Sequence, residues 1–370
     1  MLMNKKLIYI TYQTFPAYTA NSLQTISHIS HFSKMNFDVS LIFPLRNKES
    51  NSDKEVIQNF YEFSDEFNCV GTIHPLPFKK IKVFENIMYI LSHFLWSYFT
   101  VLKYKKNQED AYFFTRSEWV FYFLSKKGLN VVYECHQLSK IKRRLIASCL
   151  EISNAKIIFL NPDMLKELAL SENVRFKVIP SAYDETIFTN KKSSKNNQRI
   201  IYAGSLFRFG ESRGLELFLD KLNNLIDLNL EVIIASSDNL PGSYFKSLQA
   251  DYPNIKFEIH NKLSRKEIAN LYNTCNIGLL VNNDSLHANK FTSPLKFFEY
   301  IASGLKIMAT YNKAHNILPY QESFHYFDLD NTQSIEDAIR SSINSPQPKY
   351  EDIENYSMLN RINKIMSLFN

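Results

Sequence analysis

Short apolar runs alternate with helical patterns along both halves of this chain. The runs have the length of strands, and apolar residues recur at helical spacing between them. In the first half the runs occupy residues 7–12, 38–43, 111–114, 130–134, 156–160 and 176–179. In the second half they occupy residues 200–203, 230–235, 255–259, 277–281 and 306–309. This alternation predicts an α/β fold with a parallel, doubly wound sheet in each half.

A polar stretch separates the two series. Residues 190–197 read Asn-Lys-Lys-Ser-Ser-Lys-Asn-Asn, which is typical of a linker. The length of 370 residues also favours two domains. We therefore expect a first domain over 1–189, a linker over 190–197 and a second domain over 198–353. Two such domains place a cleft between them, where ligands usually bind.

The most hydrophobic segment covers residues 87–102. It is too short to span a membrane, and Ser92, His93 and Ser97 interrupt it. Two interpretations stay open, an amphipathic helix that faces the core and a helix that lies on a membrane surface. Basic side chains flank the segment on both sides, which keeps the second interpretation open; they are Lys79, Lys80, Lys82, Lys103, Lys105 and Lys106.

Composition narrows the class of protein. A hydrophobic content of 45% is ample for packed cores and excludes a disordered chain. The net charge of +6 suits anionic small molecules or a membrane surface, but is too small to indicate nucleic-acid binding. The 4 cysteines form no CxxC pair and no metal-ligand spacing, so we expect reduced thiols in a cytoplasmic protein. The apolar run at residues 7–10 is shorter than a signal-peptide core.

Residues 293–310 combine a capped helix with a buried strand. Ser293 is a suitable N-cap, Pro294 a suitable first helical residue and Gly304 a left-handed stop. A strand, a loop and an exposed helix N-terminus are the parts that hold a phosphate group in open α/β sheets. Within this helix Glu299 lies among aromatic and aliphatic residues, so its carboxylate needs a partner. That partner is either a ligand or Lys296, one turn earlier.

Glycines cluster after the first strand of the second half. The chain has only 8 glycines among 370 residues, far below the usual ~7%. Gly204, Gly210 and Gly214 nevertheless fall close together, which indicates either backbone approached by a ligand or a flexible loop. Arg208 and Arg213 in the same segment could bind a diphosphate. No GxGxxG and no GxxxxGK[ST] occurs, which disfavours dehydrogenase and P-loop functions.

The helical segment resembles a known family. Its pattern Ser-Pro-Leu-Lys-x-x-Glu-Tyr-x-Ala-x-Gly, residues 293–304, is similar to the donor-binding helix of family 4 retaining glycosyltransferases, which have the GT-B fold. The resemblance implies two Rossmann-like domains facing a cleft, with the last helical segment, residues 354–370, crossing back to the first domain. It also implies that Glu299 binds the ribose of a nucleotide-sugar. The helix N-terminus, formed by Ser293, Pro294, Leu295 and Lys296, would face the diphosphate.

Other segments match the same family in the expected order. Residues 202–214 resemble its strand and loop, in which a basic residue matched by Arg213 clamps the diphosphate beyond Gly204. Ser205 stands where the family often has a second basic residue, and Arg208 is our candidate replacement. The loop that contacts the nucleotide base in the family corresponds to Asn261 and Lys262.

In the first domain, residues 133–137 resemble the family pattern Tyr-Glu-x-His-Asp. The histidine of that pattern, matched by His136, contacts the donor sugar near the reacting carbon. Gln137 replaces the aspartate. A histidine just beyond a strand end is also well placed for a cleft.

The resemblance implies transfer of a sugar from a nucleoside diphosphate sugar to a hydroxyl group, with retained configuration. The acceptor would be a saccharide, a lipid-linked molecule or a protein, in the assembly of bacterial surface polysaccharide, lipopolysaccharide or glycoconjugate. Basic side chains and a helix dipole can stabilise the leaving group, so we expect no metal and no cofactor. Asp328 and Asp330 imitate a metal-binding DxD, but are better interpreted as a strand end and cap. The protein would work in the cytoplasm, with peripheral contact to the anionic inner face of the membrane as an option.

One departure leaves alternatives open. The family's paired acids are eight positions apart, and the position eight before Glu299 is Phe291. The missing acid contacts the donor sugar in the family, so an unusual donor is one interpretation. An inactive nucleotide-sugar-binding subunit of an active transferase is another, and a GT-B nucleotide-sugar epimerase is a third.

Overall fold

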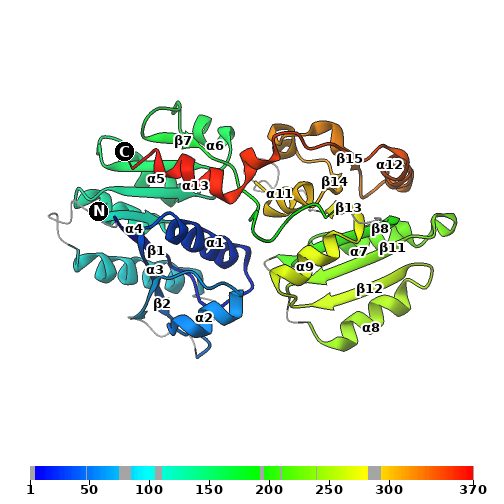
Figure 1. The fold of residues 1–370 in the computed structure, drawn as a ribbon, viewed down its shortest axis with the longest axis horizontal. Coiled ribbons are helices and arrows are strands. Elements are labelled where there is room, and N and C mark those ends of the chain that lie inside the picture. Colours follow the sequence, from blue (N-terminus) through cyan, green and yellow to red (C-terminus); the bar gives the residue numbers. More distant parts are fainter. Residues whose placement is uncertain are drawn as a thin grey trace. The chain divides into compact units, whose positions relative to one another are not determined.

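The computed structural model describes residues 5–46, 48–74, 85–104, 111–191, 196–208, 211–238, 240–281 and 293–369. The chain forms two compact units, which Figure 1 draws as ribbons. The first unit comprises Met1–Pro180 and Met358–Asn370, and the second comprises Ser181–Ser357. Within the described ranges, no helix combines the length and the hydrophobicity needed to cross a bilayer.

The first unit is built on a parallel sheet of seven described strands in the order β3-β2-β1-β4-β5-β6-β7. The strands are β1 (Lys6–Ile10), β2 (Asp38–Leu45), β3 (Asn68–Ile73), β4 (Ala111–Thr115), β5 (Val131–Cys135), β6 (Ala155–Phe159) and β7 (Phe176–Val178). Strand β3 was not predicted from the sequence. It is an edge strand with exposed and half-buried residues, so it lacks the continuous apolar run that marks the central strands.

Helices cover both faces of this sheet. They are α1 (Ala20–Lys34), α2 (Lys54–Tyr61), α3 (Glu85–Leu102), α4 (Glu118–Lys126), α5 (Lys140–Ala147), α6 (Pro162–Lys166) and α13 (Met358–Met366). With right-handed crossovers and this strand order, α1 and α2 lie on one face, and α3, α4 and α5 lie on the other. Helix α13 packs against α1, so the C-terminal helix returns to the first unit, as the resemblance implied.

The second unit repeats the plan with six described parallel strands, in the order β12-β11-β8-β13-β14-β15. These strands are β8 (Asn196–Gly204), β11 (Glu231–Ser236), β12 (Lys256–Asn261), β13 (Cys275–Leu280), β14 (Lys306–Thr310) and β15 (Phe324–Phe327). A small hairpin of β9 (Phe207–Arg208) and β10 (Glu211–Ser212) follows β8. Strand β15 was not among the predicted apolar runs, because only its two end residues are buried, but it ends at Phe327, directly before the strand end expected at Asp328.

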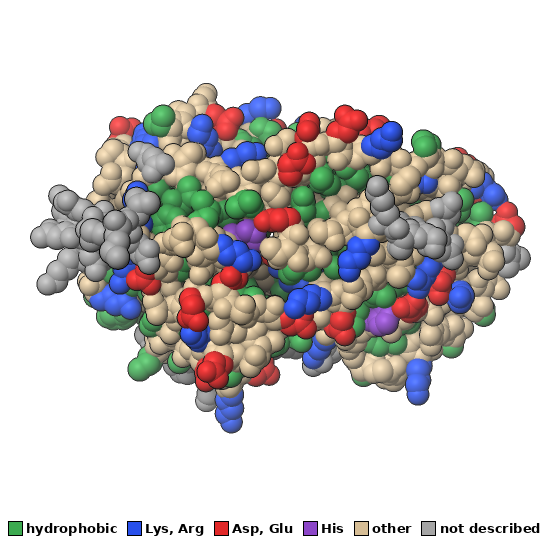
Figure 2. Space-filling view, viewed as in Figure 1, with side chains coloured by type: hydrophobic (Ala, Val, Ile, Leu, Met, Phe, Trp, Pro, Cys, Tyr) green, Lys and Arg blue, Asp and Glu red, His purple; other side chains and the backbone are tan. Residues whose placement is uncertain are grey.

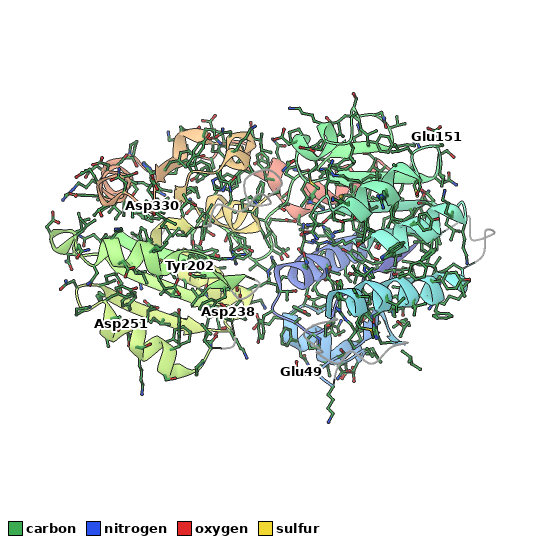
Figure 3. All side chains as sticks on the ribbon, turned by 180° about the vertical axis from the view of Figure 1, so that it is seen from behind. Glu49, Glu151, Tyr202, Asp238, Asp251 and Asp330 are labelled. Atoms are coloured by element: carbon green, nitrogen blue, oxygen red, sulfur yellow. The ribbon has the colours of Figure 1, made fainter. Side chains whose placement is uncertain are left out.

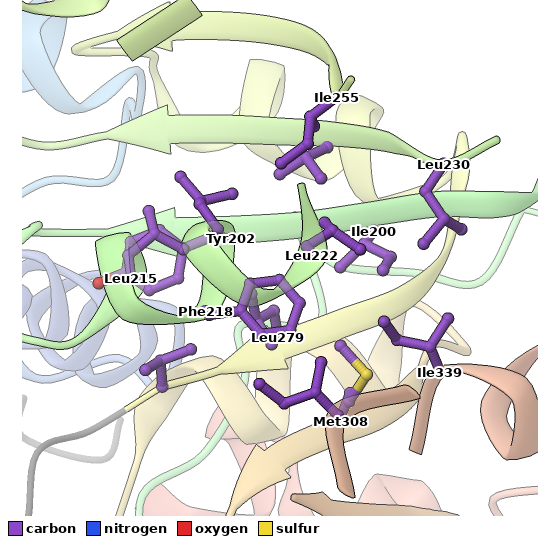
Figure 4. Packing of buried hydrophobic residues seen from close by; sticks show 14 of the residues in the cluster. Ile200, Tyr202, Leu215, Phe218, Leu222, Leu230, Ile255, Leu279, Met308 and Ile339 are labelled. Atoms are coloured by element: carbon purple, nitrogen blue, oxygen red, sulfur yellow. The ribbon is translucent and has the colours of Figure 1, made fainter. Parts of the chain in front are cut away.

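The helices of the second unit are α7 (Leu215–Leu222), α8 (Gly242–Asp251), α9 (Arg265–Tyr272), α11 (Leu295–Ala302) and α12 (Thr332–Asn344), with short 3-10 turns between them. Side chains of α7 pack over the sheet and form much of the core (Figure 4). Phe218 and Leu222 contact the cluster that contains Ile200 of β8 and Leu279 of β13. Burial of each such side chain contributes about 1.5–3 kcal/mol.

The units divide at Pro180, before the stretch expected as a linker. Ser181 already bonds within the second unit, because its backbone N–H donates to Ser293 Oγ at 3.0 Å. Asp184 follows with an ion pair to Arg265 at 3.0 Å. Of the expected linker, residues 192–195 lie outside the described residues, and β8 already begins at Asn196.

Candidate functional site

The strand order of the second unit defines where a ligand would lie. Numbered from β8, the order is 3-2-1-4-5-6, and it reverses direction between β8 and β13. Open α/β sheets bind ligands outside the carboxyl ends of their strands at such a point. Gly204 ends β8 there, and α11 begins after β13 at the same edge. The residues between Val281 and Ser293, Phe291 among them, lie outside the described residues.

The backbone at Gly204 is open to a ligand. Its φ is +145°, and apart from its chain neighbours no atom of the described residues lies within 4 Å of the position that a Cβ would occupy. The following loop is held by Asp238, one of the residues labelled in Figure 3. One carboxylate oxygen of Asp238 accepts from the backbone N–H of Leu206 at 2.5 Å, and the other lies 2.6 Å from Ser205 Oγ. Asp238 therefore holds the loop through these two hydrogen bonds, while Gly204 faces open space.

Arg213 lies at the end of this loop, half-buried. Its backbone N–H donates to Leu206 O at 3.0 Å. Its Nε atom is buried and has no hydrogen-bond partner among the described residues. Burial raises the pKa of the neighbouring Tyr202 hydroxyl to about 12, and the Arg213 guanidinium opposes that rise. Arg208 belongs to β9, but its side chain lies outside the described part of the structure.

Helix α11 begins one residue later than expected, and Ser293 is not its cap. The N-cap is Pro294, which makes no side-chain cap bond. Ser293 is instead engaged with Ser181, since Ser181 Oγ donates to Ser293 O at 2.9 Å and Ser293 Oγ accepts from Ser181 N. Among the described residues, no side chain caps the N–H groups of the first turn, which starts at Leu295 and Lys296. A helix N-terminus in this state suits an anion. Gly304, with φ +71°, ends the helix as predicted.

Glu299 lies in the middle of α11 and is only 1% exposed. Lys296 Nζ donates to its Oε2 at 2.8 Å, and the Tyr272 hydroxyl donates to the same oxygen at 3.2 Å. Burial raises the pKa of Tyr272 well above its usual value, and the Glu299 carboxylate adds to that rise. The pairing with Lys296 that the sequence left open is therefore present. It orients a buried carboxylate close to the uncapped helix end.

Asn261 and Lys262 lie at the carboxyl end of β12, and both are exposed. The backbone N–H of Lys262, at φ +54°, donates to Ser236 O at 2.9 Å. Asn261 Nδ2 donates to Leu240 O at 3.3 Å. Their position is at the same sheet edge as Gly204, two strands away. Helix α9 follows them and begins with a capping box, in which the Ser264 and Glu267 side chains each accept from the other residue's backbone N–H.

In the first unit His136 follows β5, and both of its ring nitrogens are engaged. Arg116 Nη2 donates to Nδ1 at 3.0 Å, so the ring proton is on Nε2, which contacts Glu134 Oε1. Burial lowers the pKa of His136 to about 4; the Arg116 guanidinium acts in the same direction and Glu134 opposes it. His136 is therefore neutral at pH 7.

A buried ionic network supports that histidine. Glu134 accepts from Arg361 Nη2 at 2.9 Å and lies 3.5 Å from Arg116 Nε. Arg361 Nη1 also donates to His28 Nε2 at 2.8 Å. Burial favours the neutral form of Glu134, but Arg361 and His136 outweigh it, so its pKa lies well below the usual range. Sequence reasoning missed Arg116, Arg361 and His28. Glu134, by contrast, belongs to the pattern Tyr-Glu-x-His-Asp that residues 133–137 resemble.

The DxD-like pair is a local turn. The backbone N–H of Asp330 donates to Asp328 Oδ1 at 3.0 Å. The cap of α12 is Asn331, whose side chain accepts from Ser334 N, so neither aspartate is the cap that we expected. Figure 2 shows basic and acidic side chains interspersed on one face of the molecule, in keeping with the small net charge.

Two doubly wound parallel α/β units, with the C-terminal helix returned to the first, define the GT-B fold. Solved structures agree. A sucrose-phosphate synthase from Thermosynechococcus elongatus is 14% identical with a TM-score of 0.61, over 99% of this chain and 95% of that chain. A glycosyltransferase from Rickettsia africae is 12% identical with a TM-score of 0.62, over 99% and 98%. WaaG, a glycosyltransferase involved in lipopolysaccharide biosynthesis, is 12% identical with a TM-score of 0.56, over 97% and 99%. No protein-family model and no curated protein matches the chain.

Proposed function

We propose that the protein is a retaining glycosyltransferase. It transfers a sugar from a nucleoside diphosphate sugar to a hydroxyl group, in the assembly of surface polysaccharide, lipopolysaccharide or glycoconjugate. The observation that carries the proposal is a group of features at one edge of the sheet in the second unit. There the described residues provide the open backbone of Gly204, a start of α11 without a side-chain cap, and a buried Arg213 Nε without a hydrogen-bond partner.

The proposed chemistry centres on the leaving group. As the bond from the sugar to the diphosphate breaks, negative charge grows on the diphosphate oxygens. The guanidinium of Arg213 and the N-terminal dipole of α11 stabilise that charge without rearranging. The Glu299 carboxylate accepts hydrogen bonds from the ribose, and Lys296 keeps it oriented. Asn261, Lys262 and the backbone around them receive the base.

His136 is proposed to orient the donor sugar rather than to move a proton. With a pKa of about 4 it is neutral at pH 7, and Arg116 and Glu134 engage its two nitrogens. An acid or base would need a pKa nearer the working pH. His136 is therefore proposed to contact the donor sugar through a neutral ring whose orientation Arg116 and Glu134 hold.

The leaving group is proposed to depart without metal assistance and without a cofactor, because Arg213 and α11 supply the positive charge. Turnover should then persist in excess EDTA. Loss of turnover on chelation, with recovery on adding Mn²⁺ or Mg²⁺, would contradict this part of the proposal.

The function is tested with a panel of nucleotide-sugars, starting with UDP-glucose. One structural neighbour at TM-score 0.54 and 11% identity is described as an alpha-glucosyltransferase in complex with UDP-glucose and DNA. A donor should raise the melting temperature and be slowly hydrolysed, and NMR should give a product with the anomeric configuration of the donor. Absence of both binding and hydrolysis across the panel would overturn the proposal.

A second candidate, favoured by Phe291 in place of the family's first acid, is a binding subunit without activity of its own. It predicts a thermal shift with a nucleotide-sugar but neither hydrolysis nor transfer. An isomerised sugar nucleotide in the same assay would instead indicate an epimerase.

A further inference from the structure

Helix α3 of the first unit is amphipathic, but its polar side faces inward and its apolar side faces outward. Its inward face carries polar residues, among them Ser92, His93 and Ser97, all of which are buried. His93 Nε2 lies 2.6 Å from Ser117 Oγ, and burial lowers the pKa of this histidine to about 3, so it packs inward as a neutral ring. A helix on the surface of a globular protein normally turns polar residues outward.

The outward face of α3 is apolar. Its exposed side chains, with their exposed fractions, are Ile87 (64%), Tyr89 (40%), Ile90 (41%), Leu91 (44%), Tyr98 (41%), Phe99 (56%) and Leu102 (47%). The apolar surface continues onto Ile73 at the end of β3, which is 89% exposed. Ile73, Phe99 and Lys103 line one hollow of about 310 Å³. Contiguous apolar surface of this kind marks an interaction site. In Figure 3, seen from behind, α3 is the long helix drawn in cyan.

Aromatic residues of α4 extend this face. Phe94 of α3 lies 4.9 Å from Trp119, centroid to centroid, and Tyr98 lies 5.4 Å from Phe123. Trp119, Tyr122 and Phe123 are all half-buried. Tryptophan and tyrosine with one wet and one apolar side are typical of the boundary between lipid and water.

Helix α5 packs against α4 and is basic. Of its four cations, Lys142 faces Glu118 and Arg143 pairs with Glu167. Lys140 and Arg144 are exposed and make no ion pair among the described residues. Lys103 adds a further exposed cation where α3 ends. We call the surface formed by α3, α4 and α5 the α3–α5 layer.

We propose that the α3–α5 layer binds the surface of an anionic phospholipid membrane, with α3 lying in the interface. Apolar side chains, an aromatic border and neighbouring cations are the combination by which peripheral helices hold such a surface. A second copy of the chain fits less well, because a two-fold contact through this layer would bring its cations against themselves. The proposal does not depend on the proposed glycosyltransferase activity. The α3–α5 layer covers one face of the sheet in the first unit, whereas His136 follows the end of β5.

The test is sedimentation of the full-length protein with vesicles of equal parts phosphatidylcholine and phosphatidylglycerol. The wild type should sediment at low salt, and much less with pure phosphatidylcholine or at high salt. The double variant Phe99→Asp/Leu102→Asp should lose at least about tenfold in vesicle affinity. The matched control Val174→Asp/Leu217→Asp changes two exposed apolar residues elsewhere and should sediment as the wild type does.

Two further measurements test separately the contribution of the cations and the contact of the layer with the lipid. Lys140→Gln/Arg144→Gln should weaken binding to the anionic vesicles, while Lys166→Gln/Lys246→Gln, also exposed, should not. Trp119 of α4 is half-buried in the layer, so brominated phosphatidylcholine in the anionic vesicles should quench its fluorescence, whereas Trp96 of α3 is buried and should be quenched less.

Each alternative result would overturn the proposal. One such result is that the wild type fails to sediment at low salt. Another is that Phe99→Asp/Leu102→Asp and its control lose equal vesicle affinity. A third is that tryptophan fluorescence stays unquenched when the protein is bound to the vesicles. A protein dimer that Phe99→Asp/Leu102→Asp dissociates, without any vesicle binding by the wild type, would assign the layer to self-association instead.

Discussion

Glu134 and Arg361, separated by 227 positions in the sequence, form a buried ion pair with 2.9 Å between Oε2 and Nη2. Their side chains are 0% and 2% exposed. Arg361 Nε also donates to Pro180 O at 2.8 Å, so α13 is joined both to β5 and to the last residue of the main segment of the first unit. Since the other oxygen of Glu134 contacts His136, the C-terminal helix helps to hold the orientation of that histidine.

Replacing Arg361 should strongly destabilise the protein. In Arg361→Met the buried carboxylate of Glu134 loses its nearest cation, and removal of one partner from a buried pair costs about 3–5 kcal/mol. The free energy of unfolding in urea measures this loss. Lys364→Met, the same substitution at an exposed position of α13, should change it by less than about 1 kcal/mol. Comparable small losses in both variants would show that the network contributes little.

Glu299 is expected to govern nucleotide affinity. Glu299→Ala should weaken binding of the donor nucleotide by about 1.5–3 kcal/mol, the scale of a hydrogen bond to a charged group. Calorimetry measures this affinity. The variant also removes the partner of Lys296 and Tyr272, so circular dichroism must establish that it is folded. Glu336→Ala, which removes a surface acid paired with Arg340, is the control. A folded Glu299→Ala protein with wild-type affinity would refute the ribose assignment.

Most of the sheet was predictable because central parallel strands are buried on both faces and read as apolar runs. Strand β3 has only exposed and half-buried residues, and β15 is buried only at its two ends, so neither contains such a run. Of β15 only the end was foreseen, at Asp328. The capping serine of α11 was wrong for a different reason. Ser293 satisfies a local rule, but a residue 112 positions away, Ser181, uses its hydroxyl and carbonyl.

The site was predictable where a motif is local in sequence and not where it is assembled by the fold. Glu299 and Lys296 are one turn apart, so their pairing could be foreseen. The ion pair of Glu134 with Arg361 could not, because no spacing rule connects β5 with α13. The orientation of α3 was equally beyond the sequence, since its period defines two faces without saying which one is covered.

Arg213 is expected to act on turnover more than on substrate affinity. Charge on the leaving diphosphate is greatest in the transition state, so Arg213→Ala should lower kcat by about 10²–10³ with a smaller change in KM. Steady-state kinetics with the preferred donor separates the two constants. Arg340→Ala removes an exposed arginine from the surface of α12 and is the matched control. A raised KM with an unchanged kcat would make Arg213 a binding residue only.

His315 should make the protein sensitive to acid. Its side chain is 0% exposed, neither ring nitrogen has a hydrogen-bond partner among the described residues, and burial lowers its pKa to about 4. The ordinary value is 6.5, so the neutral ring favours folding fully above that pH, and the benefit is lost as pH falls from about 6.5 through about 4. A shift of this size corresponds to about 2 kcal/mol lost by pH 5 and up to about 3 kcal/mol lost below pH 4.

The variant His315→Phe keeps a ring of similar shape against Phe324 and Tyr326 but cannot gain a proton. Because the nitrogens make no bonds with described residues, its stability at pH 7 should be close to that of the wild type. Urea unfolding at pH 7 and pH 5 should then give a smaller acid-induced loss in the variant, by about 2 kcal/mol. His315→Gln cannot titrate either, so it should show the same reduced pH dependence even if its packing is poorer. A wild-type pH dependence retained in both variants would mean that His315 does not titrate with folding, and that the acid sensitivity belongs to other groups.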